Sequence, residues 1–244
     1  MDLNQVSLGL GIGASAAAVV AALWALWQLF RKSWERTVGG RRSQARILDQ
    51  LACGSSLAFA EARLGVAQFV AQRAPLEQRI YRLPGAWVLL EVSDDTVRSF
   101  SITITDPSMH YPTERLTFGR LAVELGKDTF TCAAPDFNGE RLWIGARRMG
   151  YLRHYYFGNP GGYQNYWLSY NMSGAGTFPP GTRFASGDYS AYCDEDSTST
   201  SDTSSIVVNT LTVVSPEWHA LEHYMERDVL GPDHDLVRLS RGNA

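Results

Sequence analysis

The 244-residue chain carries 22 Lys and Arg against 25 Asp and Glu, together with three cysteines. Six of the basic residues fall within residues 31–46, so residue 47 onward holds 16 basic against 23 acidic side chains. An acidic body lacks the clustered Lys and Arg that phosphate contacts need, which argues against nucleic acid as a partner. Cys53, Cys132 and Cys193 are odd in number and widely spaced, so they provide no disulfide framework.

The first element in chain order is an uncharged stretch from Val6 to Phe30. As a helix it reaches roughly 37 Å at about 1.5 Å per residue, enough to cross a ~30 Å hydrocarbon core. Trp24 and Trp27 lie toward its basic end, where aromatic residues gather at the membrane–water interface. The sequence therefore predicts a transmembrane helix over residues 6–30, after a short head at residues 1–5.

The charges that flank this helix predict its orientation. A secretory signal peptide is the competing interpretation, but such a peptide carries positive charge before its apolar region and a cleavage site after it. Here Asp2 precedes the stretch, and Arg31-Lys32 follow it at once. Basic flanks favour the cytoplasmic side. We expect a single-pass protein of the cell membrane, with its N-terminus outside and its C-terminal domain in the cytoplasm.

Gly9 and Gly13 form a small-xxx-small pattern within the predicted helix. That spacing lets two helices approach closely in lipid and is typical of a dimerising face. Small residues are also common in membrane helices that do not dimerise. A homodimer through this face is thus one expectation, and the lipid bilayer is the partner that the segment itself predicts.

Residues 31–42 are expected to form a basic juxtamembrane hinge, followed by a soluble domain over 43–230 and a tail over 231–244. Ser43 can begin a helix that runs to about Ala52. Ser55 or Ser56 can begin a second helix, and Leu64-Gly65 ends it in the manner of a left-handed terminator. These two segments predict a short helical hairpin.

The hydrophobic period then changes to that of strands, at Arg79–Leu83, Ala86–Val92 and Val97–Thr105. Short turns between them predict an antiparallel meander. In the third segment, Phe100 and Ile102 alternate with Ser and Thr, which predicts one face on a core and one face toward water.

The remainder of the chain mixes further strands with loops. A short helix is expected at Leu121–Gly126, a low-complexity loop at residues 193–205, and a last helix from Ser215-Pro216 to about Leu230. Cys53 and Cys132 are expected to be buried as small hydrophobic residues. Further strands are expected at Thr129–Cys132, Arg141–Arg148, Tyr151–Phe157, Gln164–Tyr170 and Ile206–Val214. The fold class that this order predicts is α+β.

The run from Ile47 to Ser56, the Leu64-Gly65 pair, and the meander that ends at Asp106 together resemble an uncharacterised family of bacterial single-pass membrane-anchored proteins. At fold level the pattern is similar to the small domains of outer-membrane assembly lipoproteins (the SmpA/OmlA type) and of β-lactamase inhibitor protein. The resemblance implies a binding module without catalysis. Leu125-Gly126 repeats the Leu-Gly pair. We therefore also expect that the soluble domain contains two tandem copies of this unit.

Aromatic residues are unusually dense from Tyr151 to Tyr170, and arginines accompany them. Aromatics with Arg match the residue bias of binding hot spots, although packing in the strand core is the alternative explanation. The residues proposed for binding are Tyr155, Tyr156, Tyr163, Tyr166, Trp167, Arg148 and Arg153. They predict a non-enzymatic binding or scaffold protein that presents its cytoplasmic domain to a protein partner.

The competing function is a metal-dependent or hydrolytic membrane-tethered enzyme. His219 and His223 stand four residues apart on the last expected helix, as in helical zinc pairs. Their order departs from the metalloprotease motif, because the general-base Glu is misplaced. The sequence contains no phosphate-binding loop, dinucleotide fingerprint or nucleophile elbow, so no cofactor and no catalytic residue is expected.

Overall fold

The computed structural model describes Trp24 and residues 40–73, 75–144, 149–158, 163–178, 189–192, 205–216 and 230–236. For residues 73, 143, 144 and 189–192 it describes the backbone alone. The chain divides into two compact units, Met1–Ser43 and Gln44–Ala244.

In the first unit the structure describes Trp24, which is helical and exposed, and the start of a helix over residues 40–48. Val6, Trp27, Phe30 and the Gly9/Gly13 pair lie outside the described residues. Among the residues that are described, no helix combines the length and the apolar character needed to cross a membrane.

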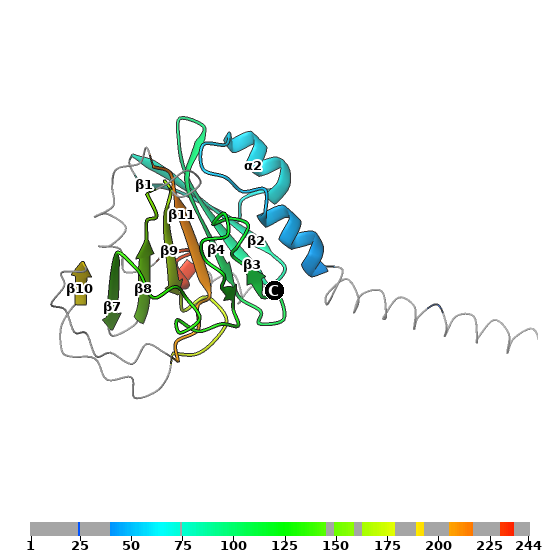
Figure 1. The fold of residues 1–244 in the computed structure, drawn as a ribbon. Coiled ribbons are helices and arrows are strands. Elements are labelled where there is room, and N and C mark those ends of the chain that lie inside the picture. The colour runs from blue at the N-terminus through cyan, green and yellow to red at the C-terminus, as the bar shows by residue number, and fades with distance from the viewer. Residues whose placement is uncertain are drawn as a thin grey trace, which may run out of the picture. The chain divides into compact units, whose positions relative to one another are not determined.

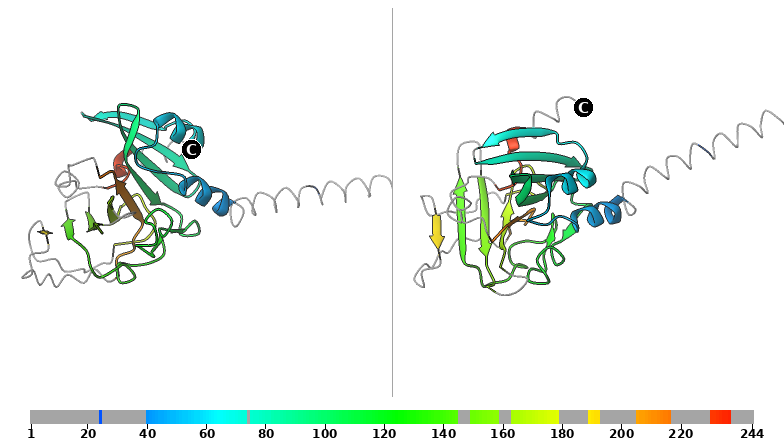
Figure 2. Two further views of the ribbon diagram at one scale, coloured as in Figure 1. Left: turned by 45° about the horizontal axis from the view of Figure 1, so that its top comes forward. Right: turned by 90° about the horizontal axis from the view of Figure 1, so that it is seen from above.

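The second unit is built on an antiparallel sheet whose strand order is β1-β2-β3-β4-β11-β9-β8-β7-β10 (Figure 1). Its first half comprises β1 (Phe69–Arg73), β2 (Leu76–Leu83), β3 (Ala86–Ser93) and β4 (Thr96–Ile104). Its second half comprises β7 (Gly139–Ile144), β8 (Met149–Tyr155), β9 (Asn165–Tyr170), β10 (Tyr189–Tyr192) and β11 (Thr210–Val214). Seen from above, β2 and β3 run across β8 and β9, so the sheet twists strongly between its halves (Figure 2). With few helices described beside this sheet, the α+β class is confirmed.

Helix α2 (Leu57–Leu64) begins and ends where the sequence predicts. The Ser56 hydroxyl accepts a hydrogen bond from the Phe59 amide at 3.2 Å, which satisfies one of the free amides of the first turn. Gly65 follows with φ 83 and ψ −144, so it has the positive φ expected of a terminator but not the left-handed helical ψ. The buried residues Leu57, Ala60 and Leu64 lie on one side of the helix and enter the core.

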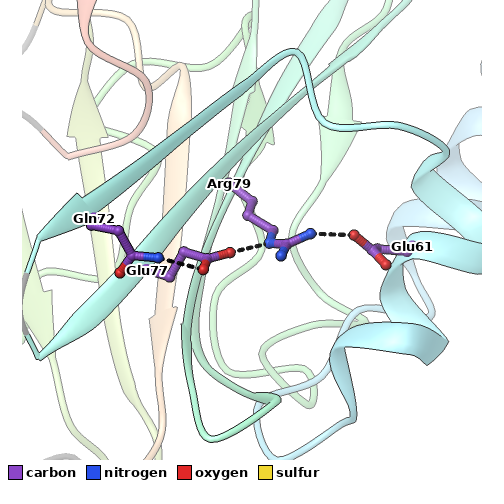
Figure 3. A network of polar contacts seen from close by, with 4 residues as sticks. All are labelled: Glu61, Gln72, Glu77 and Arg79. Carbon is purple, nitrogen blue, oxygen red and sulfur yellow. Dashed lines mark hydrogen bonds and ion pairs between the residues drawn. The ribbon is translucent and has the colours of Figure 1, made fainter.

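A chain of polar contacts ties α2 to the first two strands (Figure 3). Arg79 of β2 donates to Glu61 of α2 and to Glu77 on its own strand. Gln72 of β1 donates to the other Glu77 oxygen at 2.6 Å. All are partly exposed, so each pair contributes little by itself, and the network serves mainly to fix how α2 lies on the sheet.

The predicted meander is confirmed, with turns made by the residues that the sequence indicates. Leu83 pairs with Ala86 and Ser93 pairs with Thr96, so each turn has two residues. Asp94 and Asp95 both have positive φ, 52 and 54, which is the conformation that a two-residue hairpin of right-handed twist requires.

One face of the sheet, called here the first face, carries the main apolar core. Val88 and Leu90 of β3, together with Phe100 and Ile102 of β4, point into it. It is covered by α2 and by the segment at residues 109–137, which contains the two-stranded ladder of β5 (Tyr111–Pro112) and β6 (Glu124–Leu125). Several buried side chains of this segment belong to the same core: Tyr111, Leu116, Leu121, Val123, Leu125 and Phe130.

The opposite, second face does not meet water at β4, contrary to the sequence prediction. Ser99, Ser101 and Thr103 alternate with the core residues as expected, but all three are buried. The Ser101 and Thr212 hydroxyls lie 2.7 Å apart, and those of Thr103 and Thr210 lie 2.8 Å apart. Because these hydroxyls bond one another across β4 and β11, they can leave water without an unsatisfied polar group.

Residues 230–236 lie against this second face. An added Cβ on Gly231 (φ +91) would stand 2.6 Å from the Thr103 hydroxyl, so the backbone passes directly over β4. The Asn171 side-chain amide donates to the carbonyls of Leu230 at 2.7 Å and Pro232 at 3.1 Å. Leu236 then packs on the apolar cluster of Ile80, Trp87 and Leu89.

Three local expectations between residues 121 and 132 are wrong. No helix forms at Leu121–Gly126, because Leu125 pairs with Tyr111 and the Gly126 amide donates to the Val208 carbonyl at 2.8 Å. Thr129 makes a single bridge to Val207 instead of starting a strand. Cys132 is exposed because it lies in the turn that follows.

Candidate functional site

The predicted aromatic surface is largely interior. Tyr155, Tyr166 and Trp167 are fully buried. Tyr155 and Tyr166 point into the core on the first face, whereas Trp167 lies on the second face. A side chain without solvent exposure cannot contact a partner of the folded domain. These three residues therefore pack the sheet, and the packing explanation holds for them.

Arg153 is held within the domain by several contacts at once. Its Nη1 donates to the Phe130 carbonyl at 3.0 Å and its Nε to the Tyr151 hydroxyl at 2.8 Å. Its guanidinium also lies 4.7 Å from the Phe137 ring centroid. Tyr151 in turn donates to Glu140. Arg153 thus joins β8 to the segment that covers the first face, and Arg148 lies outside the described residues.

His154 and Trp167 stack on the second face, with ring centroids 4.1 Å apart. His154 Nε2 lies 2.8 Å from the Asn165 side-chain oxygen. Burial lowers the pKa of His154 to about 4, although the Asn165 hydrogen bond acts in the opposite direction. The imidazole is therefore neutral at neutral pH. Because it is buried, it is a structural group of the sheet and not an accessible acid or base.

Two members of the predicted surface remain exposed, namely Tyr156 at 43% and Tyr163 at 50%. They flank the connection between β8 and β9, so they lie at the same end of the sheet. The Tyr156 amide donates to the Asn138 side chain at 2.6 Å, which fixes the backbone where β8 ends.

Phe118 is an exposed aromatic residue that sequence reasoning missed. It is 63% exposed and has φ 51, an uncommon conformation for a bulky side chain. Its loop is fixed from below by two buried threonines. The Thr113 hydroxyl donates to the Leu121 carbonyl at 2.6 Å, and the Thr117 hydroxyl donates to the Thr113 carbonyl at 3.0 Å. The loop therefore holds Phe118 outward on a rigid base, and the Phe118-Gly119 pair was its only sequence signal.

The Phe118 loop lies next to the end of β8. The Arg120 guanidinium stands 5.8 Å from the ring centroid of Phe157, which directly follows Tyr156. Phe118, Tyr156 and Tyr163 are called here the aromatic rim. An exposed Phe and two exposed Tyr, together with Arg120 close to Phe157, have the composition of a protein-binding hot spot.

A separate pocket of about 430 Å³ lies at the β2–β3 turn. Arg82 and Trp87 line it from the second face, and the Arg82 guanidinium stands 5.9 Å from the Trp87 ring centroid. Leu83, Pro84, Gly85 and Thr105 complete the described lining.

The structure brings together no metal ligands in the part of the chain that it describes, where no group of three His, Cys, Asp or Glu side chains could hold an ion. His219 and His223 lie outside the described residues, as does most of the 193–205 loop. Cys53 is half-buried, its thiol lies 3.5 Å from the Val213 carbonyl, and burial raises its pKa. Such a thiol is a poor nucleophile.

No protein-family model matches the chain, and a comparison with characterised proteins finds no match by sequence. Among solved structures, the chain is similar to a cysteine-rich secretory protein from Staphylococcus aureus subsp. aureus Mu50, with a TM-score of 0.38 and 8% sequence identity. The match covers 68% of this chain and 45% of that chain, so it spans under half the length of that protein. The resemblance to outer-membrane assembly lipoproteins and to β-lactamase inhibitor protein stays a prediction.

Proposed function

We propose that this chain is a membrane-anchored, non-enzymatic binding protein that engages a protein partner through the aromatic rim. The observation that carries the proposal is the Phe118 loop. Its phenylalanine is exposed and held at positive φ by a base of buried threonine hydrogen bonds. A bulky residue in an unfavourable conformation that gains no burial from it is more readily explained by a contact made outside the domain.

The proposal includes the membrane anchor. Residues 6–30 carry no charge and precede six basic residues within 31–46, which supports a single-pass helix with the N-terminus outside. The binding domain then faces the cytoplasm, and Gly9/Gly13 is the face through which two copies would pair. The protein partner is a cytoplasmic or peripheral membrane protein, because the domain is tethered at the inner surface.

The proposal also treats the domain as two tandem units. Four strands from β1 to β4 run from one edge toward the centre, and β7, β8, β9 and β11 run from the other side toward the same centre. Gly65 and Gly126 share the same positive φ, 83 and 82. These similarities support a repeated origin for the strands, although the second Leu-Gly pair does not follow a helix.

The test is affinity purification of the full-length chain from gently solubilised membranes. The variant Phe118→Ala/Tyr156→Ala/Tyr163→Ala removes the rim without touching a buried residue. Its matched control is Phe59→Ala/Val66→Ala/Val70→Ala, which removes three exposed apolar side chains elsewhere. Loss of two or more hot-spot side chains costs about 2 kcal/mol or more, roughly a thirty-fold weaker complex.

The expected result is a stoichiometric partner that the rim variant loses and that both wild type and control retain, with unchanged thermal unfolding midpoints. Retention of the partner by the rim variant would contradict the proposal, as would equal loss in the control. Variants of Tyr166 or Trp167 are unsuitable for this test, because both are buried and their loss would unfold the domain.

A further inference from the structure

The pocket at the β2–β3 turn is distinct from the aromatic rim. Its lining comes from the ends of β2 and β3, from the Pro84-Gly85 turn, and from Thr105 just beyond β4. The turn is rigid, since the Thr105 amide donates to the Gly85 carbonyl at 2.9 Å. A volume of about 430 Å³ falls within the range of small-ligand pockets. The pocket is thus large enough for a small molecule or the last residues of a peptide.

Arg82 gives this pocket its charge. Its side chain is exposed and lies over Trp87, and among the described residues it forms no ion pair. An arginine held against an aromatic ring keeps its planar fork oriented, with its outer N–H groups free for a planar anion. Trp87 is almost wholly buried, so it offers the pocket one apolar edge. Pro84 extends that apolar wall, whereas the Leu83 side chain belongs to the core of the first face.

The surroundings select a singly charged anion. Among the described lining residues Arg82 is the one cationic side chain, and the described acidic group next to the turn is Asp106. An added Cβ on Gly85 would stand 3.3 Å from the Asp106 Cβ, and the carboxylate of Asp106 accepts from the Ser108 amide at 2.9 Å. A doubly charged phosphate ligand would be repelled by the Asp106 carboxylate and would have only one arginine to balance its charge. A ligand with a single carboxylate needs no more than one arginine. Thr105 adds a hydroxyl that can donate to the same group.

We propose that this pocket binds a carboxylate attached to an apolar or aromatic group. Arg82 pairs with the carboxylate through two parallel N–H donors, Thr105 contributes a hydroxyl, and the apolar body packs against Pro84 and the edge of Trp87. Two sources share this chemistry, namely a free aromatic acid and the C-terminal carboxylate of a peptide that ends in an apolar residue. The site does not depend on the aromatic rim or on the function proposed above.

The test is isothermal titration calorimetry of the full-length chain in detergent, with benzoate as the probe and benzamide as its uncharged counterpart. A second pair of probes is a short peptide that ends in Phe, with a free carboxylate or a C-terminal amide. Arg82→Gln removes the charge, Arg82→Lys keeps the charge but loses the fork, and Thr105→Val removes the hydroxyl at constant shape. Arg115→Gln is the matched control, because Arg115 is an exposed arginine that bonds Asp49 elsewhere.

The expected result is that benzoate binds wild type and Arg115→Gln equally, and binds Arg82→Gln about 10- to 100-fold more weakly. Arg82→Lys and Thr105→Val fall between these limits, and the amides do not bind. A peptide acid that binds more tightly than benzoate identifies a peptide C-terminus as the ligand, and the reverse order identifies a free acid. Absence of binding by both acids to wild type overturns the proposal, as does equal affinity of Arg82→Gln or of the amides. Thermal unfolding of each variant shows that a loss of binding does not arise from unfolding.

Discussion

The two faces of the large sheet are both buried at its centre, but by different chemistry. On the first face, Phe100 and Ile102 of β4 pack under α2 and the segment at residues 109–137. On the second face, Ser101 and Thr103 of the same strand bond the hydroxyls of β11, and the backbone at Gly231 lies over Thr103. Burial of the first face is driven by apolar area, whereas on the second face the buried hydroxyls of Ser101 and Thr103 are satisfied by those of Thr212 and Thr210. Small hydroxyl side chains also leave room for a backbone segment to lie close to the sheet.

The largest effect is expected on the first face. Phe100 is buried among the apolar core residues, so Phe100→Ala leaves a cavity that its neighbours fill only in part. We expect a loss of roughly 3–5 kcal/mol in the free energy of unfolding. Denaturant unfolding of the full-length chain measures this loss, with the exposed Phe59→Ala as control. A loss below about 1 kcal/mol, comparable to that of an exposed site, would show that the first face is not the main core.

The second-largest effect concerns pH and the buried histidine of the second face. The pKa of His154 is lowered from 6.5 to about 4 in the folded state, whereas the unfolded chain protonates near 6.5. Between these values the unfolded state binds more protons, so stability falls as pH drops from about 6.5 toward 4. The contribution of the buried neutral His154 to the free energy of unfolding is fully present above pH 6.5 and amounts to roughly 3 kcal/mol.

Unfolding measured across this pH window tests the contribution of His154. In His154→Gln the slope of stability against pH is expected to be flatter than in wild type, whatever the variant's absolute stability. The control is His110→Gln, which removes a histidine that lies 3.9 Å from Glu124. An unchanged slope in His154→Gln would mean that the buried imidazole is not the titrating group.

The smallest effect tests the hydroxyl pairs of the second face. Ser101→Ala leaves the buried Thr212 hydroxyl without its described partner, at a cost of roughly 1–3 kcal/mol. The double variant Ser101→Ala/Thr212→Val removes both hydroxyls, and we expect it to be less destabilised than the sum of the two single variants. A double-mutant cycle by denaturant unfolding gives the coupling free energy. Strict additivity would show that the pair does not stabilise the face.

Local signals in the sequence predicted local structure well. Ser56 and Gly65 bound α2 where the capping rules place them, and the two turns of the first meander follow from Pro84-Gly85 and Asp94-Asp95. The Leu-Gly pair was less specific. At Gly126 it marks only a positive φ, because the residues before it find their hydrogen-bond partners in β5 and near Val208. A glycine thus reports a backbone conformation, and it does not report which element precedes it.

The sequence pattern did not predict the features of the fold that depend on residues distant in sequence. Alternation in β4 predicted which side chains share a face but not that both faces are covered, because the segment that lies over the second face, at residues 230–236, is distant in sequence. Likewise, the aromatic density from Tyr151 to Tyr170 could not be divided into buried and exposed members. That division depends on strand register, which buries Trp167 on the second face and leaves Tyr156 and Tyr163 just beyond the strand ends.

The position of β11 has a consequence for how the domain folds. This strand pairs with β4 on one side and β9 on the other, so it joins the two halves of the sheet. Ser101 and its partner Thr212 are separated by 111 positions in sequence. Closing so long a loop costs chain entropy before any contact is gained, and such topologies fold slowly. Until β11 is inserted, β4 and β9 each expose an unpaired edge, and these edges are where association between partly folded chains would begin.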